Sequence, residues 1–499
     1  MNDAIENKFE HRILDNVHGF IYYTDTERKI IESQYFKRLQ SIKQLSIANW
    51  VFPGSEHTRF IHSLGVMYLA DKIASRFDCL DENERKIVRL AGLLHDIGHY
   101  PLSHVCEYPY QASLTSFPDA SYCAAVNLKV KNRIDTFSLK PSVSFMERRT
   151  GLHHERVGAD LIEYNSEISS LIIKECGADA PQIIADMVTG NVERKLTENQ
   201  ELMVQILHSE LDADGIDYLM RDASFSGTSF GSFEVDQLIN SMEAQDYEGL
   251  KIMCISPKGI AAADQYLINK FFSYSQVVNN KHISITEWMA EQIVDWMQKN
   301  NAYFPSPQRL KDLVDSCHTS TDKGYLDFTD NFFWASLQNI LSNPLAHTTP
   351  KFILHFCREL LRHNELEYEN GSEVRLISSE ADEIKKELSE SWTYKCLSSW
   401  TDRISIFSTR SMSKHTPSKI FEAAIEDSIS RASSADGMTS SDHGPIQIDD
   451  IPQLKRRRLM EGICVADNDL HLLCDDYRSL MQVLYNQTLV ILRAFKCPL

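Results

Sequence analysis

Apolar residues recur at near-helical spacing along most of the first 300 residues. The apolar positions between residues 24 and 45 follow this spacing: Ile30, Ile31, Phe36, Leu39, Ile42 and Leu45. Thr26 and Glu27 suggest a helix start there, and Pro53 with Gly54 predicts a break. Further helices are predicted over residues 62–77, 81–98, 199–223 and 282–300. Strand-like alternation is weak and is clearest over residues 247–256, so the pattern predicts a mostly α fold.

Helical patterning continues after residue 300 and then gives way to a different composition. Residues 349–363 predict another helix, whereas residues 428–450 are rich in Ser, Gly and Asp, which is typical of a flexible linker. The basic run at 455–458 is expected to be a solvated stretch rather than a nucleic-acid patch. Residues 475–495 are apolar, and we expect them to be helical and to dock on the body of the protein or on a partner.

These changes divide the chain into four expected regions. We expect one domain over residues 1–300, a helical C-terminal region over 301–425, a flexible linker over 426–455 and a helical tail over 456–499.

Composition narrows the class of protein. The 499 residues carry a formal net charge of −19, which disfavours sequence-independent binding to nucleic acid. No apolar run approaches the length of about 20 residues that a membrane span needs, and the acidic, polar N-terminus does not resemble a secretory signal. The 11 cysteines include no C-x-x-C pair, which is typical of reduced thiols in a cytosolic protein.

The segment "LAGLLHDIGHYPLSH", residues 90–104, places polar residues in an apolar helical run. Burying them costs several kcal/mol unless they are paired. His95 and Asp96 together suit a metal such as Fe, Mn, Co or Zn. A third ligand is expected from His57 or His62. The acids that could supply a fourth are Glu210, Asp212, Asp214 and Asp217.

The order of several motifs carries more weight than any one of them. The chain reads R-F-x-H-S-x-G-V, then A-G-L-L-H-D-I-G-H-x-P-x-S-H, then H-H-E, then L-D-A-D-x-x-D-Y-x-x-R-D. Over residues 10 to 300 this order resembles the HD-domain metal-dependent phosphohydrolases. The branch it resembles holds the bacterial deoxynucleoside triphosphate (dNTP) triphosphohydrolases and the vertebrate sterile-alpha-motif/HD enzyme, although no sterile-alpha-motif domain is present. The resemblance implies an HD-domain helical bundle core with a smaller α(+β) C-terminal region.

The resemblance also implies roles for single residues. The metal ligands it implies are His62, His95, Asp96 and Asp214, with Asp212 as the alternative to the last. The catalytic residues it implies are His99, His104, Glu107 and His154, where the register disfavours His153 and the family often has Asp in place of Glu107. The substrate-binding residues it implies are Gln44, Leu45, Arg59, Tyr218 and Asp222. Arg59 has a second interpretation, as a structural ion-pair residue.

The activity that follows from the resemblance is hydrolysis of a dNTP to a deoxynucleoside and triphosphate. It implies Fe, Mn, Zn or Co at the HD site and Mg with the substrate phosphates. It also implies a cytoplasmic homo-oligomer regulated by nucleotides, with dNTP depletion during phage infection as a biological role. Two alternatives are a phosphodiesterase or nuclease acting on oligonucleotides or cyclic nucleotides, and a nucleotide-sensing regulatory subunit.

The chain departs from the family pattern in three places. Gly215 stands where the family has a cation that reaches the phosphates. Val278 and Asn280 replace an aromatic residue and a histidine at the base platform, although Lys281 remains. Residues 108–150 form an expected insertion, which we interpret either as a lid that replaces the lost cation or as a surface loop or oligomer contact. The cations of this insertion are Lys129, Lys131, Arg133, Lys140, Arg148 and Arg149.

Overall fold

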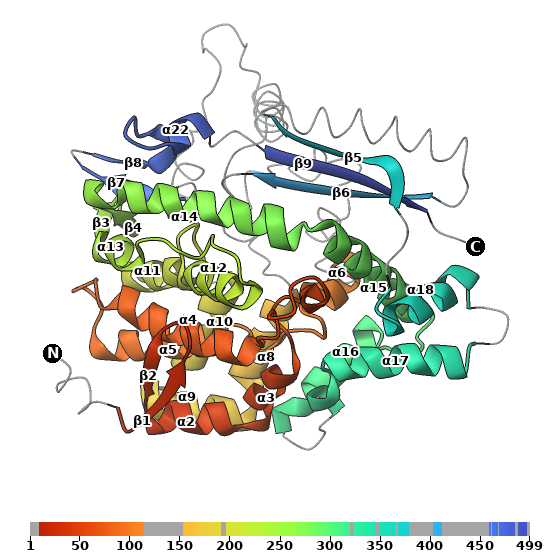
Figure 1. Ribbon diagram of the computed structural model, residues 1–499. Coiled ribbons are helices and arrows are strands. Elements are labelled where there is room, and N and C mark those ends of the chain that lie inside the picture. The colour runs from red at the N-terminus through yellow and green to blue at the C-terminus, as the bar shows by residue number, and fades with distance from the viewer. Residues whose placement is uncertain are drawn as a thin grey trace, which may run out of the picture.

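The structure is a computed structural model of the 499-residue chain (Figure 1). It describes residues 9–113, 153–190, 196–319, 324–345, 349–364, 368–378, 403–411, 459–460, 462–467, 469–484 and 488–496. The six insertion cations, the expected linker at 426–455 and the basic run at 455–458 lie outside these residues.

Helices dominate the described chain, as the pattern predicted. The first group is α2 (Asp25–Glu32), α3 (Gln34–Lys37), α4 (Arg59–Ala74), α5 (Glu82–Leu94), α6 (His104–Ser113), α8 (His153–Tyr164), α9 (Ser166–Cys176), α10 (Ala180–Thr189), α11 (Glu198–Leu207), α12 (Ala213–Ser226), α13 (Val235–Asn240), α14 (Ile260–Ser273) and α15 (Lys281–Lys299). The second group is α16 (Pro307–Ser316), α17 (Asp330–Ser342), α18 (Lys351–Leu361) and the single turn α22 (Met481–Leu484).

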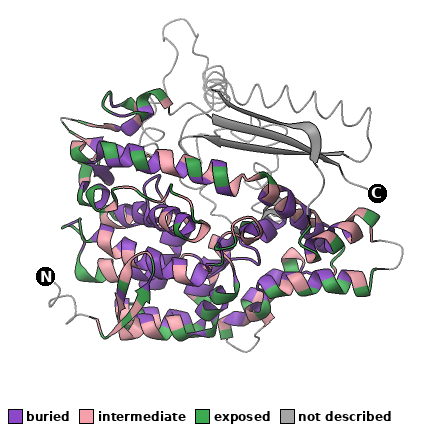
Figure 2. Cartoon of the chain, in the orientation of Figure 1, coloured by how far each residue is buried: buried purple, intermediate pink, exposed green. Residues whose placement is uncertain are grey.

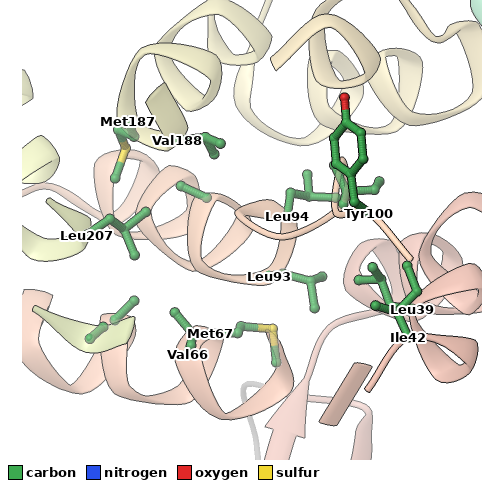
Figure 3. Close-up of a cluster of buried hydrophobic side chains, with 14 of the residues drawn as sticks. Leu39, Ile42, Val66, Met67, Leu93, Leu94, Tyr100, Met187, Val188 and Leu207 are labelled. Atoms are coloured by element: carbon green, nitrogen blue, oxygen red, sulfur yellow. The ribbon is translucent and has the colours of Figure 1, made fainter. Parts of the chain in front are cut away.

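One hydrophobic core holds the first group together. α4 buries residues on nearly all of its faces, between α5, α11 and α12. Figure 3 shows part of this core, where side chains of α4 and α5 meet those of α10 and α11. Figure 2 shows the buried residues gathered where the helices face one another and the exposed ones along the outer faces. Each fully buried Leu, Val or Met contributes about 1.5–3 kcal/mol to folding.

Helix starts follow their capping residues. Thr24 and Glu27 form a capping box at α2, so the helix begins at Asp25, one residue before the Thr26 start that the sequence suggested. Asp81 and Glu84 form the same device at α5 and confirm that start. The helix predicted over residues 199–223 is wrong in its middle, because α11 ends at Leu207 and α12 begins only at Ala213.

Three small sheets complete the fold. β1 (His11–Asp15) and β2 (Gly19–Tyr23) form an antiparallel hairpin. The second sheet has the order β3 (Met242–Tyr247), β4 (Leu250–Ile255), β7 (Cys464–Ala466) and β8 (Leu470–Leu472), with β4 and β7 parallel. The third has the order β5 (Tyr368–Ser378), β9 (Thr488–Lys496) and β6 (Arg403–Ser411), all antiparallel.

The C-terminal segment differs from the predicted helical tail. In the described part of residues 475–495 the α-helix is limited to α22, and β9 begins at Thr488. The segment docks on the helical body through β7 and through Asp264 of α14, which accepts hydrogen bonds from the Ser479 hydroxyl and the Leu480 N–H. β5 and β6 likewise replace helix that was expected over residues 301–425.

Two further expectations concern the environment of the chain. Among the described residues, the helices are all too short or too polar to cross a bilayer. The cysteines of this part of the chain are free thiols, and burial raises the pKa of some of them, such as Cys254 to about 12.

Candidate active site

The four expected metal ligands come together where α4, the end of α5 and the start of α12 meet (Figure 1). Nε2 of His62 lies 2.9 Å from Oδ1 of Asp214 and 3.3 Å from Nε2 of His95. Oδ1 of Asp96 lies 3.5 Å from Nε2 of His95, and Oδ2 of Asp96 lies 3.8 Å from Nε2 of His62. Ligand atoms about 2.1 Å from one ion are about 3–4 Å from one another, so these separations fit a single coordination shell.

The end of α5 sets the positions of His95 and Asp96. The helix stops at Leu94 rather than continuing to residue 98, so both residues stand in the turn that follows. Gly92 allows the close approach of α4, because a Cβ at this position would lie 3.1 Å from the α4 backbone. The Gly92 carbonyl accepts a hydrogen bond from Nδ1 of His95 at 2.8 Å, which leaves Nε2 as the nitrogen that faces the other ligands.

Asp214 owes its place to the break between α11 and α12. Asp212 caps α12 by accepting a hydrogen bond from the N–H of Gly215 at 2.7 Å. Asp214 therefore stands in the first turn of α12, where the helix dipole favours a carboxylate. Glu210, another acid that the sequence offered, pairs with Lys270 at 3.2 Å instead.

The electrostatics of the site favour a cation. Burial alone would lower the pKa of His62, but its hydrogen bonds to Asp214 and Asp217 raise it to about 10. Burial would raise the pKa of Asp96, yet the Arg59 guanidinium and the neighbouring histidines hold it well below its ordinary value. A divalent ion that replaces the protons on the ligand atoms balances the same negative charges. Two imidazoles and two carboxylates therefore fit the ion that the sequence predicts.

A histidine cluster lies next to the four ligands and contains the expected catalytic residues. The rings of His99 and His154 stack with centroids 4.1 Å apart, and the ring of His104 meets both edge-on. Glu107 holds two of these rings, because Oε2 accepts from Nδ1 of His104 and Oε1 accepts from Nδ1 of His154, both at 2.9 Å. Nε2 of His99 lies 3.8 Å from Oδ1 of Asp96, which places the cluster directly beside the expected ion.

Glu107 fixes the charge of this cluster. Burial alone would lower the pKa of His154, but the adjacent Glu107 carboxylate raises it to about 9. In turn His154 and His104 hold the pKa of Glu107 well below its ordinary value, although burial opposes this. Glu107 and His154 are therefore both charged at neutral pH. The His104 side chain is 59% exposed, so a ligand that enters the site can reach it.

His99 presents an N–H to the site. Its Nδ1 accepts the N–H of Tyr100 at 3.1 Å, so the ring proton is on Nε2. Burial and the Arg59 charge push the pKa of His99 well below its ordinary value, which keeps the ring neutral. Nε2 is buried and lacks a hydrogen-bond partner within the described residues, a cost that an incoming oxygen would remove. A protonated nitrogen cannot ligate a metal, so the three rings suit phosphate oxygens better than a second ion, although their nitrogens lie within 4.8 Å of one another.

Arg59 joins the ligands to the histidine cluster. Its Nη1 donates to Oδ2 of Asp96 at 2.8 Å, and its Nε donates to Oγ of Ser103 at 2.9 Å. The structure therefore shows the ion-pair role that was one of the two interpretations of Arg59. Its contact with a substrate phosphate stays a prediction.

A strained turn places His104. Leu102 and Ser103, directly before it, have φ angles of 51° and 54°, in the left-handed region that non-glycine residues seldom adopt. Asp330, at the start of α17, accepts a hydrogen bond from the Leu102 N–H at 2.7 Å and from the Lys43 N–H at 3.0 Å. The turn thus depends on a residue that lies far away in the sequence.

The other expected substrate residues are buried or half-buried within the protein. Gln44 donates its N–H to the His57 carbonyl at 3.0 Å, and its Oε1 is buried without a partner within the described chain; Leu45 follows and is half-buried. Asp222 is buried and accepts a hydrogen bond from Nε2 of His57 at 2.8 Å. The histidine that lies with His95 and Asp96 is His62, not His57. Tyr218 is half-buried on α12. Their roles in binding stay predictions.

The positions at which the chain departs from the family pattern have local structural explanations. A Cβ on Gly215 would lie 2.3 Å from Oη of Tyr266, so this tyrosine occupies the space that a longer side chain would need. Asn280 caps α15 by accepting a hydrogen bond from the N–H of His282 at 3.0 Å. Val278 is half-buried and lies two residues before this cap.

Sequence reasoning missed several residues that support the site. Asp330 gave no signal, because its partners Leu102 and Lys43 are 228 and 287 positions away in the chain. Asp217 was considered only as a metal ligand, whereas it accepts a hydrogen bond from Nδ1 of His62, on the side away from the other ligands. The i, i+4 pair of Asp217 and Arg221 was the one local signal for its true position.

Comparison with known proteins identifies the domain. Residues 59–222 match the HD domain family, and this stretch contains all four expected ligands. An uncharacterized protein of Mycoplasma pneumoniae is 32% identical over 289 residues, which is 58% of this chain and 56% of that protein. The chain therefore spans about half the length of the curated relatives it matches.

Two relatives with named activities match smaller parts. The deoxynucleoside triphosphate triphosphohydrolase SAMHD1 homolog of Dictyostelium discoideum is 29% identical over 233 residues, which is 46% of this chain and 38% of that protein. The corresponding enzyme of Bos taurus is 44% identical over 99 residues, or 19% of this chain and 17% of that one. A crystal structure of a hypothetical protein from Aquifex aeolicus shares the fold, with a TM-score of 0.62, 21% identity, and coverage of 98% of this chain and 96% of that chain.

Proposed function

We propose that this HD-domain protein is a metal-dependent phosphohydrolase that converts a dNTP and water into a deoxynucleoside and triphosphate. One observation carries the proposal: the four expected ligands for a divalent ion lie directly beside a His–Glu–His cluster whose Glu107 is buried and whose His104 is accessible. As part of the same proposal, the protein works as a nucleotide-regulated homo-oligomer and depletes dNTPs during phage infection.

The residues suggest a division of labour. His62, His95, Asp96 and Asp214 would hold the ion, which when bound supplies an activated water and neutralises phosphate charge. The neutral His99 would donate its Nε2 proton in a hydrogen bond to a phosphate oxygen.

Proton transfer would fall to His104. Its Nδ1 is tied to Glu107, so the proton on Nε2 is the one available to the leaving oxygen. When water attacks the α-phosphorus, the bond from that phosphorus to the 5′ oxygen of the deoxynucleoside breaks. This oxygen takes the proton, and the three phosphates leave as one unit.

Fewer observations support a dNTP as the substrate than support phosphohydrolase activity. It is supported by the resemblance of the motif order and by partial similarity to two enzymes named for dNTP hydrolysis. Gly215 and Val278 take a cation and an aromatic ring away from the expected pocket, so the base and the phosphate contacts require a direct test.

Product identification tests the proposal. Purified protein is incubated with each dNTP, each NTP and single-stranded DNA in turn, with Mn, Mg or Co, and the products are identified by mass spectrometry. We expect deoxynucleoside and tripolyphosphate from dNTPs. Asp96→Asn should abolish this turnover, whereas Asp295→Asn, at an exposed acid paired with Lys299, should not change it. Nucleotide monophosphates from DNA would instead support the nuclease alternative.

A further inference from the structure

A buried network of charges stands behind His62, on the side away from the other ligands. Oδ2 of Asp217 accepts a hydrogen bond from Nδ1 of His62 at 2.7 Å and from Nε of Arg221 at 2.8 Å. Oδ1 of the same carboxylate accepts from Nε2 of His18 at 2.6 Å and from Nη2 of Arg221 at 3.0 Å. Asp217 therefore has both oxygens fully engaged, and its side chain is 0% exposed.

The network continues into the N-terminal hairpin. Nη1 of Arg221 donates to Oδ2 of Asp15 at 2.8 Å. Oδ1 of Asp15 also accepts from the N–H groups of Val17 and His18 at 2.9 Å, so Asp15 fixes the turn between β1 and β2. This hairpin lies outside residues 59–222, which match the HD domain family. A segment from beyond the domain thus reaches the shell around the expected metal.

α4 makes room for the network at one glycine. A Cβ on Gly65 would lie 1.9 Å from Oδ1 of Asp217 and 2.4 Å from Nη2 of Arg221. Glycine in the interior of a helix costs about 1 kcal/mol relative to alanine. A glycine at position 65, three residues after His62, is explained if the Asp217 carboxylate must pack against α4 at this position.

We propose that Asp217 is a positioning residue for the metal ligand His62, and that the N-terminal hairpin holds Asp217 through Asp15 and His18. A carboxylate that accepts the Nδ1 proton fixes the tautomer and the orientation of the ring and makes Nε2 a stronger ligand. The inference rests on the metal site of the proposed function. It adds that affinity for the ion depends on a segment outside the HD domain.

Metal affinity, measured without substrate, tests the inference. Metal-free protein is titrated with Mn²⁺ alone, and binding is followed by electron paramagnetic resonance. Asp217→Asn keeps the size of the side chain but replaces one acceptor by a donor. Loss of such an outer-shell partner typically weakens metal binding about 10–100-fold, and we expect this change in Kd. Asp264→Asn is the matched control, because Asp264 is a buried carboxylate that anchors Ser479 instead.

Two variants of His18 separate positioning from folding. His18→Ala removes a hydrogen bond to Asp217 and should weaken Mn²⁺ binding several-fold. His18→Gln retains an N–H donor and should restore most of the affinity. Circular dichroism melts identify any variant that fails to fold, and the His18 pair then decides the question.

The outcomes distinguish this inference from the proposed function. Wild-type affinity in folded Asp217→Asn, or equal affinity in the two His18 variants, would overturn the inference, even if the protein hydrolyses dNTPs. The expected losses of affinity in a protein that hydrolyses no nucleotide would support the inference and overturn the proposed function. Wild-type protein that does not bind Mn²⁺ would overturn both.

Discussion

Replacing Asp330 by Asn should slow the proposed reaction without affecting the metal. The turn formed by Leu102 and Ser103 holds two non-glycine residues in the left-handed region, at about 1–2 kcal/mol each. Asp330 opposes this cost by accepting the Leu102 and Lys43 N–H groups with its two oxygens. Asn has the same shape but turns an NH₂ group toward one of these donors, so one bond is lost.

The size of the effect follows from that bond. A hydrogen bond to a charged group contributes about 1.5–3 kcal/mol. If the loss falls on the placement of His104, the next residue along the turn, kcat should drop about 10–100-fold, since 1.36 kcal/mol corresponds to a factor of ten. KM and metal content should change little, because Asp330 contacts none of the four expected ligands.

Two measurements check this prediction. Steady-state release of tripolyphosphate gives kcat and KM, and hydrogen exchange with mass spectrometry on the peptide around Leu102 reports the turn even without turnover. The Leu102 amide should exchange faster in Asp330→Asn than in the wild type. Its exchange should not change in Asp312→Asn, because Asp312 is an exposed acid on α16. A folded Asp330→Asn variant with wild-type kcat and wild-type exchange would refute the reasoning.

Three further changes have expected results. Gly215→Ala should destabilise the protein by about 1–3 kcal/mol in urea melts, because its Cβ meets Oη of Tyr266, and adding Tyr266→Phe should recover part of the loss. The pKa of His154 is raised from 6.5 to about 9, so its stabilising contribution is complete below pH 6.5 and is lost as the pH rises through 9. The fall in unfolding free energy over this interval should be smaller in Glu107→Gln. Removal of divalent ions by a chelator should lower Tm, and added Mn²⁺ should restore it in a concentration-dependent manner, because an ion that binds only the folded state stabilises it.

The sequence allowed prediction of the expected ligands because their spacing is a local property. His95 and Asp96 are adjacent, and His57 and His62 were the histidines expected to supply a third ligand. The last ligand, Asp214, needed the resemblance, since the residues alone left Glu210, Asp212 and Asp217 open. The structure distinguishes these acids by their partners: one pairs with Lys270, one caps α12, and one lies behind His62.

A smaller α(+β) C-terminal region was expected from the resemblance, but the positions of its strands could not be predicted from apolar periodicity. Residues 488–496 are a short apolar run, and such a run fits a buried strand as well as a helix. The choice was made by pairing with β5 and β6, which are distant in the sequence. Strand preference depends on such neighbours more than helix preference does. The local pattern alone therefore predicted a helix where the structure has β9.

The residues that support the site could not be predicted for a related reason: their partners are also distant in the sequence. Arg221 and Arg38 are buried guanidinium groups that join residues 59–222 to the segments around them. Arg221 pairs with Asp15, and Arg38 donates to the Phe328 carbonyl at 2.6 Å. Arg38 also donates to the His99 carbonyl at 2.7 Å, so it links the region around Phe328 to the expected catalytic histidines. Leaving a buried charge without its partner costs about 3–5 kcal/mol, a large part of the 5–15 kcal/mol that stabilises a typical domain. Residues 59–222 therefore contain the expected ligands, whereas the segments that precede and follow them hold the residues that support these ligands.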